Sequence, residues 1–483
     1  MPVKLRLRGR CRRGKVAVGL ERTPPQRCIW WRPGGNLGAP GDLEKASTAG
    51  RRARPRFGWN VVSGGVIDTA CAALANFVTA AYAVRSLSPA YLGIYAFWMA
   101  AYRLATTVPA QFVYVPSEIE SLALQGNDRL RVMPRSFERA IVPTLLSTLG
   151  IAMVAYQLTP STEQSSLPLA VTAALASLVT AGQEHLRRVF HLAGHPYRAS
   201  IVSFTCLLTA GLALVINEVL SGDPSWVPLG ALALAYALSG LVGWLMAMHL
   251  QSGGDPVEVP WHRMQASGRP LLVAGMAPLI AGFATAALIG RLAGPAALGF
   301  AEAARVISRP VFVVVLGVGN GLRPRSMEAG KVRDYSYARR TSRRLQLLVL
   351  FATFAYLLGA GAAFPWNPFP LLFPTAYEVP WLVALTVIAA GLDGVALPYR
   401  YELLGSHLER LYARVELLGS AIRTAIASAS PWLQSFAMPI GLMSLALLRL
   451  IGYRRGLATA YKTEITLDLR APSEARKSDR LQS

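Results

Sequence analysis

Long apolar stretches recur along the chain from residue 60 to residue 452, and short polar segments separate them. Each is close to the about 20 residues that an α-helix needs to cross the hydrocarbon core of a bilayer. Transmembrane β-strands would instead alternate polar and apolar positions over about ten residues, a pattern that these stretches lack. The sequence therefore predicts twelve membrane-spanning helices. They cover residues 60–84, 89–115, 139–158, 167–184, 199–219, 227–248, 270–290, 295–321, 345–365, 379–398, 412–430 and 433–452.

Basic residues are distributed unevenly among the connecting segments. If the N-terminus lies inside, the inside loops hold nearly all of the loop arginines and lysines, whereas the longer outside loops hold none. This is the positive-inside bias of membrane proteins, and it predicts that both termini are cytoplasmic. The inside loops are 116–138, 185–198, 249–269, 322–344 and 399–411, and the longer outside loops are 159–166, 220–226 and 366–378.

The composition agrees with a membrane protein. Hydrophobic residues make up 53% of the 483 residues and charged residues 16%, against about 25% in soluble domains. The net charge of +23 is concentrated at the start, where residues 1–57 contain fifteen basic and three acidic residues. We expect residues 1–58 to form a disordered cytoplasmic arm that touches membrane lipid and binds no nucleic acid.

Motifs for bound groups are missing from the sequence. The four cysteines form no CxxC pair or metal-ligand spacing, and no Walker A pattern occurs. We therefore expect no cofactor, no metal site and no catalytic residue.

An internal repeat relates the first and seventh predicted spans. Residues 75–93 (ANFVTAAYAVRSLSPAYLG) match residues 281–299 (AGFATAALIGRLAGPAALG) at ten of nineteen positions, and Arg103 aligns with Arg309 at the same offset of 206. The offset covers six predicted spans, so both copies enter the membrane in the same direction. Such a parallel repeat predicts two six-helix lobes around a central cleft, an arrangement typical of alternating-access transporters.

The repeat and the loops divide the chain into five predicted segments. These are the arm 1–58, the N-lobe 59–250, a cytoplasmic linker 251–269, the C-lobe 270–453 and a cytoplasmic tail 454–483.

Two short runs of the sequence resemble a known family. The run from Ala83 to Tyr95 (AVRSLSPAYLGIY) and the run from Gln183 to Arg198 (QEHLRRVFHLAGHPYR) resemble Wzx-like polysaccharide flippases of the multidrug/oligosaccharidyl-lipid/polysaccharide (MOP) exporter superfamily. The resemblance implies an all-α integral membrane protein with a MATE/MOP-like fold. It also implies a polyprenyl-diphosphate-linked glycan as substrate. Many relatives have fourteen spans, whereas this sequence predicts twelve.

Ionisable residues interrupt several apolar spans, where they are expensive and often functional. Glu302, Arg305 and Arg309 have i, i+3 and i+7 spacing, which places them on one face of the eighth span. Lipid would destabilise such a face, so we expect it to line the cleft opposite Arg103. The residues concerned are Asp68, Arg103, Glu302, Arg305, Arg309, Asp393, Glu416 and Arg423.

A cationic cleft would suit a phosphate-bearing substrate, because arginine binds phosphate through two parallel hydrogen bonds. The candidate substrate-binding residues are Arg103, Arg305 and Arg309, with Arg85 and Arg291 nearer the outer mouth. The candidate residues for coupling to H⁺ or Na⁺ are Asp68, Glu302 and Asp393.

Structural ion pairs are the alternative explanation for the same residues. In that case Arg305 pairs with Glu302, and Arg103 pairs with Asp68. Glu416 would likewise form a pair with Arg423 inside one lobe.

Together these features predict an exporter of a lipid-linked oligosaccharide or polysaccharide precursor in the cytoplasmic (inner) membrane. It would work in cell-surface polysaccharide synthesis beside other assembly proteins, and it would not be an enzyme. A cation-coupled multidrug antiporter of the same superfamily is the first alternative, which the excess of arginine disfavours. A membrane-embedded glycan polymerase or ligase is the second, and the short outside loops, which lack histidine, disfavour it.

Overall fold

The computed structural model describes residues 59–121, 126–159, 167–251, 260–311, 335–361, 380–406 and 408–481, with a few isolated positions between these ranges. Within them all regular structure is helical. The longer helices are α2 (Trp59–Ser86), α3 (Pro89–Pro109), α5 (Met133–Leu158), α6 (Leu167–Leu192), α7 (Pro196–Val219), α8 (Val227–Leu250), α9 (Trp261–Leu292), α10 (Pro295–Ile307), α12 (Tyr335–Gly361), α14 (Pro380–Gly405), α15 (Glu409–Ser428) and α17 (Ala437–Leu481). The short elements are the π-helix η1 (Ala110–Tyr114), α4 (Val115–Ser121), η2 (Gly126–Val132), α16 (Ser430–Leu433) and η4 (Gln434–Phe436).

Over its described residues, each predicted span overlaps one of the longer helices. Among the described residues, seven helices are long and apolar enough to cross a membrane by length and composition, and they include α2, α7, α8 and α14. The remaining predicted spans fall on α3, α6, α10, α12 and α15. These helices carry ionisable side chains within the apolar sequence, or they are described only in part.

Proline begins several of the helices, because its fixed φ suits the first turn and its missing N–H needs no acceptor there. Pro89, Pro196 and Pro295 stand at the starts of α3, α7 and α10. Gly194 and Gly294 precede two of these starts with φ angles of 85° and 92°. These left-handed conformations favour glycine, so proline and glycine together fix the tight turns between successive helices.

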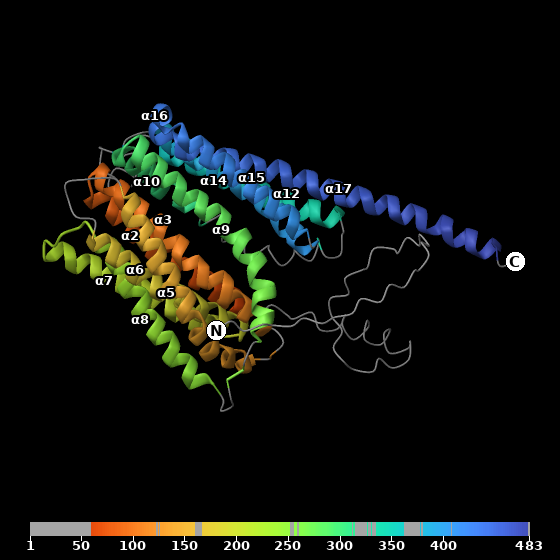
Figure 1. Cartoon of the computed structure of the whole chain (residues 1–483), viewed down its shortest axis with the longest axis horizontal. Coiled ribbons are helices and arrows are strands. Elements are labelled where there is room, and N and C mark those ends of the chain that lie inside the picture. Colours follow the sequence, from red (N-terminus) through yellow and green to blue (C-terminus); the bar gives the residue numbers. More distant parts are fainter. Residues whose placement is uncertain are drawn as a thin grey trace, which may run out of the picture. The chain divides into compact units, whose positions relative to one another are not determined.

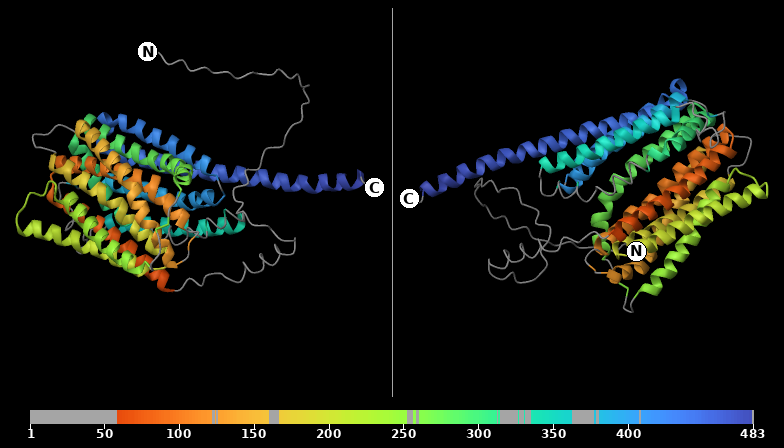
Figure 2. Two further views of the ribbon diagram at one scale, coloured as in Figure 1. Left: turned by 60° about the horizontal axis from the view of Figure 1, so that its bottom comes forward. Right: turned by 180° about the vertical axis from the view of Figure 1, so that it is seen from behind.

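The helices of each half pack mainly on one another. In the first half α2 contacts α7, α7 contacts α8, and α6 contacts α8. In the second half α14 and α15 both contact α17, and α12 contacts α14. Figure 1 shows α9 between α3 of the first half and α15 of the second, and both are contacts of α9. In Figure 2, α17 is one continuous helix.

The halves share their largest apolar cluster, which centres on α3, α9 and α10. Tyr95, Phe97 and Trp98 of α3 are buried in it together with Ile289 of α9 and Leu298 of α10. The predicted two-lobe helical architecture is confirmed, and α3 and α10, which begin at the repeated prolines, are one pair of helices that joins the lobes.

The α3–α10 crossing is reciprocal. A Cβ atom built on Gly93 would lie 1.8 Å from the carbonyl oxygen of Pro295, and one built on Gly299 would lie 1.9 Å from that of Pro89. The distances to the backbone nitrogen of the opposite glycine are 3.1 Å and 3.2 Å. The two copies of the repeat therefore contact each other through equivalent atoms, as a local two-fold axis requires. Only glycine allows helix backbones to approach so closely.

Two further contacts join the halves at the same helix ends. The guanidinium of Arg291, near the end of α9, donates hydrogen bonds to the carbonyls of Gln157 (2.8 Å) and Leu158 (3.2 Å) at the end of α5. The hydroxyl of Tyr377 donates to the carbonyl of Leu87 over 2.8 Å. In this conformation the halves are held together at the ends where α2, α5 and α9 finish.

Candidate functional site

Arginines surround a single carboxylate on α10. Arg305 binds Glu302, with 2.6 Å between Nε and Oε2, so this predicted pair is present. Nη2 of Arg309 lies 4.0 Å from Oε1 of the same carboxylate, and Nη1 donates to the backbone oxygen of Asn76 on α2. Glu302 is 2% exposed, whereas the two guanidinium side chains are 20% and 14% exposed.

Arg309 lies beyond the regular helix on which the sequence placed it. α10 ends at Ile307 and a turn follows at Ser308. The i, i+7 spacing therefore does not set the direction of Arg309. Its guanidinium still reaches Glu302, because the chain resumes a helical course after the turn.

Arg103 of α3 brings a third cation to this group from the first half of the chain. It interacts electrostatically with Arg305 and Glu302, and its guanidinium donates no hydrogen bond to another described residue. Nη2 of Arg309 and the hydroxyl of the buried Tyr95 also lack hydrogen-bond partners there. We call Tyr95, Arg103, Glu302, Arg305 and Arg309 the central cluster. It holds three positive charges and one negative charge, and several of its polar atoms have no hydrogen-bond partner among the described residues.

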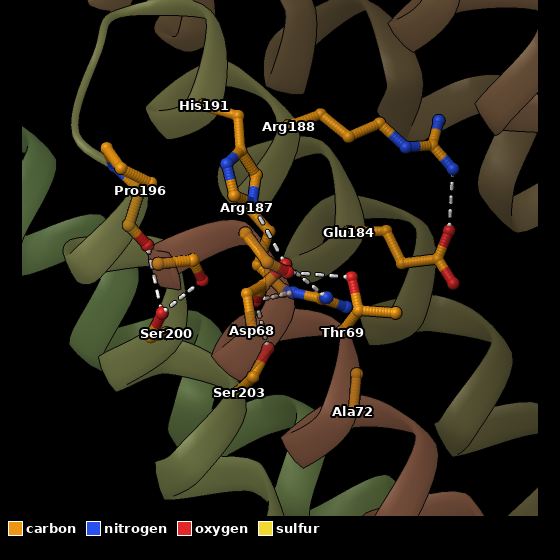
Figure 3. A network of polar contacts seen from close by, with 12 residues as sticks. Asp68, Thr69, Ala72, Glu184, Arg187, Arg188, His191, Pro196, Ser200 and Ser203 are labelled. Carbon is orange, nitrogen blue, oxygen red and sulfur yellow. Dashed lines mark hydrogen bonds and ion pairs between the residues drawn. The ribbon is translucent and has the colours of Figure 1, made fainter. Parts of the chain in front are cut away.

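Asp68 belongs to a different network, so its predicted pairing with Arg103 is wrong. Figure 3 shows the carboxylate of Asp68 on α2 facing Arg187 and His191 of α6 and Ser203 of α7. Arg187 binds both carboxylate oxygens, over 2.9 Å and 2.7 Å, while His191 lies at 2.9 Å and Ser203 donates over 2.5 Å. Asp68 is therefore fully hydrogen-bonded within the first half.

The predicted pairing of Glu416 with Arg423 is also wrong. Arg449 of α17 binds Glu416 of α15 over 2.9 Å and 2.6 Å, and its Nη1 lies 2.5 Å from the carboxylate of Asp393 on α14. The hydroxyl of Tyr453 donates to Glu416 as well. Arg449 thus ties three helices of the second half together, and both acids are engaged.

Arg85 and Arg291 lie at the ends of α2 and α9, away from the central cluster. Arg85 is exposed. Arg291 is occupied by the carbonyls at the end of α5, as described above. Such hydrogen bonds satisfy carbonyls that have no partner within their own helix.

Three residues on which these networks depend were not among the site residues predicted from the sequence. Arg187 and Arg449 neutralise the buried acids, and Tyr95 places a hydroxyl beside the arginines. A lone arginine inside an apolar span was the available signal for Arg449. Tyr95 offered none, since tyrosine is common in apolar helices. Within the described residues no group of His, Cys, Asp and Glu could hold a metal ion.

Sequence comparisons give no relative. No protein-family model matches the chain, and no curated protein matches it.

Solved structures share its fold. An inward-facing multidrug resistance MATE family transporter of the MOP superfamily aligns with a TM-score of 0.63 and 13% identity, covering 81% of this chain and 96% of that one. An outward-facing MATE family transporter aligns with a TM-score of 0.56 and 12% identity, covering 83% and 95%. A MOP superfamily transporter from Pyrococcus furiosus, described as having a binding pocket of reverse polarity that suggests a different function, aligns with a TM-score of 0.58 and 12% identity, covering 83% and 95%. This chain therefore has the helical fold of the MATE transporters of the MOP superfamily.

Proposed function

We propose that this protein is an alternating-access exporter that moves a lipid-linked oligosaccharide or polysaccharide precursor, carried on a polyprenyl diphosphate, across the cytoplasmic membrane. The proposal includes the predicted orientation, with both termini cytoplasmic, and a place among the proteins of cell-surface polysaccharide synthesis. It contains no bond-making step.

The central cluster is the observation that carries this proposal. Its charge is an excess of two positive units beside the helices that join the halves. A buried charge without a partner is strongly unfavourable in a membrane. Arg103 and the Nη2 atom of Arg309 therefore indicate that an anion takes up the missing interactions.

Arginine is well suited to a diphosphate. Its planar guanidinium binds phosphate oxygens through two parallel, charge-assisted hydrogen bonds, and the hydroxyl of Tyr95 supplies a further donor. Because Arg103 comes from one half and Arg309 from the other, a bound anion would contact both. A change in the angle between the halves would then change the positions of both arginines around the phosphate.

Coupling to H⁺ or Na⁺ would use one of the acids Asp68, Glu302 and Asp393. Each is paired with an arginine in this conformation, so a coupling step must exchange or break one of these pairs. Asp393 has the most accessible side chain of the three, with 33% exposed against 5% and 2%. We therefore expect Asp393→Asn to abolish transport driven by an ion gradient while leaving substrate binding intact.

A flipping assay tests the proposal directly. Proteoliposomes would hold the purified protein and a fluorescent oligosaccharide on polyprenyl diphosphate, and an impermeant quencher would report which leaflet holds the label. Arg103→Gln and Arg309→Gln should each slow flipping about tenfold or more, because each removes a charge-assisted contact. Arg455→Gln, at an exposed site on α17, is the matched control. Unchanged flipping in both cluster variants would refute the proposed mechanism.

Cation-coupled multidrug antiport is the second candidate, because the structural neighbours include multidrug resistance transporters of the MATE family. The excess of arginine disfavours cationic drugs. The Pyrococcus furiosus transporter, described as having a pocket of reverse polarity, shows that proteins of this fold differ in this respect. Export of a cationic dye by the same proteoliposomes, with no flipping of the lipid-linked glycan, would favour antiport.

A further inference from the structure

Arg423 of α15 forms no ion pair with any residue that the structure describes. Glu416, two turns away, is occupied by Arg449 and Tyr453. The Nε atom of Arg423 is buried without a hydrogen-bond partner, and no other described residue accepts a hydrogen bond from its guanidinium. The side chain as a whole is only partly buried, so some of its donors face open space.

A glycine on α9 fixes where this guanidinium lies. A Cβ atom built on Gly282 would be 3.6 Å from Nη2 and 3.7 Å from Nη1 of Arg423. The guanidinium therefore lies against α9 at Gly282, where α9 has no side chain. α9 is the helix between α3 and α15 (Figure 1). On its other side, the stem of Arg423 packs against Gly441 of α17, whose Cβ would be 3.1 Å from Cγ.

Gly282 on α9 and Arg305 on α10 lie at similar distances along their helices from the turn that joins these helices. Gly282 precedes Leu292, the last residue of α9, by ten residues, and Arg305 follows Pro295, the first residue of α10, by ten residues. At about 1.5 Å per residue, both lie about 15 Å from the turn that joins the two helices. Arg305 and Arg423 are also close enough to repel each other.

We propose that Arg423 is a substrate-binding residue that contacts the second phosphate of a diphosphate and so distinguishes diphosphate from monophosphate carriers. The inference rests on the proposed function and extends it. Arg103, Arg305, Arg309 and Arg423 against Glu302 give an excess of three positive charges. A glycosyl diphosphate lipid brings two negative charges on adjacent phosphates, whereas a glycosyl monophosphate lipid brings one.

Two lipid probes test this inference. The dissociation constants of polyprenyl diphosphate and polyprenyl monophosphate would be measured on the full-length protein in nanodiscs. Arg423→Gln should weaken diphosphate binding by about tenfold or more, as expected for loss of a charge-assisted contact, and change monophosphate binding less than about threefold. Arg423→Lys keeps the charge and should restore part of the lost selectivity. Arg455→Gln should change neither constant.

The outcomes separate the two proposals. Equal weakening for both probes, or no weakening for either, would overturn the role of Arg423 while leaving the central cluster intact. Wild-type protein that binds neither probe would overturn the proposed function itself. The unfolding temperature of each variant shows whether it is folded. If Arg423→Gln does not fold, Arg423→Lys alone decides, because a purely structural role predicts unchanged selectivity in that variant.

Discussion

The reciprocal crossing of α3 and α10 gives a quantitative prediction. Gly93→Ala places a methyl group 1.8 Å from the carbonyl oxygen of Pro295, and Gly299→Ala places one 1.9 Å from that of Pro89. In both cases the obstacle is backbone, which has no rotamer to change. The helices must therefore move apart. The conformation in which α3 and α10 are in direct contact, called the closed crossing below, becomes less stable.

The size of the effect follows from the geometry. Ordinary van der Waals contact begins near 3.4 Å, so the backbones must separate by about 1.6 Å at this point. Overpacking of this kind costs about 1–3 kcal/mol. Since 1.4 kcal/mol is a factor of ten, the population of the closed crossing should fall by about 5- to 150-fold relative to conformations in which the helices are apart. The double variant should lose less than the sum of both, because the first methyl group already separates the helices.

Disulfide cross-linking measures this population. Cysteines replacing Ala90 and Ala296, the repeat-related residues after Pro89 and Pro295, would be oxidised in a background without the native cysteines. Gly93→Ala and Gly299→Ala should slow cross-linking to the same extent. Gly211→Ala on α7, where a Cβ would meet nothing within 4 Å, is the matched control. If the two repeat glycines behave like Gly211, or differ strongly from each other, the reciprocal contact is not what holds the halves together.

Three further predictions concern residues outside the central cluster. Asp68→Asn leaves the guanidinium of Arg187 without its counter-ion and should destabilise the protein by about 3–5 kcal/mol in chemical unfolding. The double variant with Arg187→Gln should recover part of this lost stability. No recovery would argue against the ion pair between Asp68 and Arg187. Arg291→Gln removes two hydrogen bonds to the end of α5 and should speed hydrogen exchange there, as measured by mass spectrometry, with Arg85→Gln as the unaffected control. Burial and the charge of Arg198 lower the pKa of His195 below its usual 6.5. The unfolded chain therefore binds more protons than the folded chain as the pH falls through 6.5, so stability decreases at acid pH. His195→Gln should make the unfolding temperature less dependent on pH between 7.5 and 5. The same dependence of unfolding temperature on pH in the variant and the wild type would contradict this.

The positions of the helices were predictable from the sequence, and their rotation about their own axes was not. The apolar stretches located α2, α7 and α8 within a few residues, because the thickness of the bilayer fixes span length. Which residue on α6 would face Asp68 depends on how α2, α6 and α7 pack together. Arg187 lies 119 residues away from Asp68, and no local spacing relates the two. The pairing of Arg103 with Asp68 failed for this reason.

The repeat predicted more than the hydropathy did. It placed Pro89 and Pro295, and Gly93 and Gly299, in equivalent positions, and it predicted the parallel halves. It did not predict that the two copies would contact each other, since equivalence by symmetry does not require proximity to the axis. The charges of the eighth span were also only partly predictable. The i, i+7 spacing places Arg309 on the face of Glu302 only in a continuous helix, and a turn at Ser308 interrupts that helix.

The crossing also has a consequence for how such a chain can be divided. A surface that pairs with its own duplicate is the kind that joins the subunits of a two-fold homodimer. Each half carries one Pro-x-x-x-Gly edge and meets the same edge in the other, so the linker between the halves is not needed to define the contact. Two separate polypeptides, one for each half, therefore retain at this point everything required to find each other in a membrane.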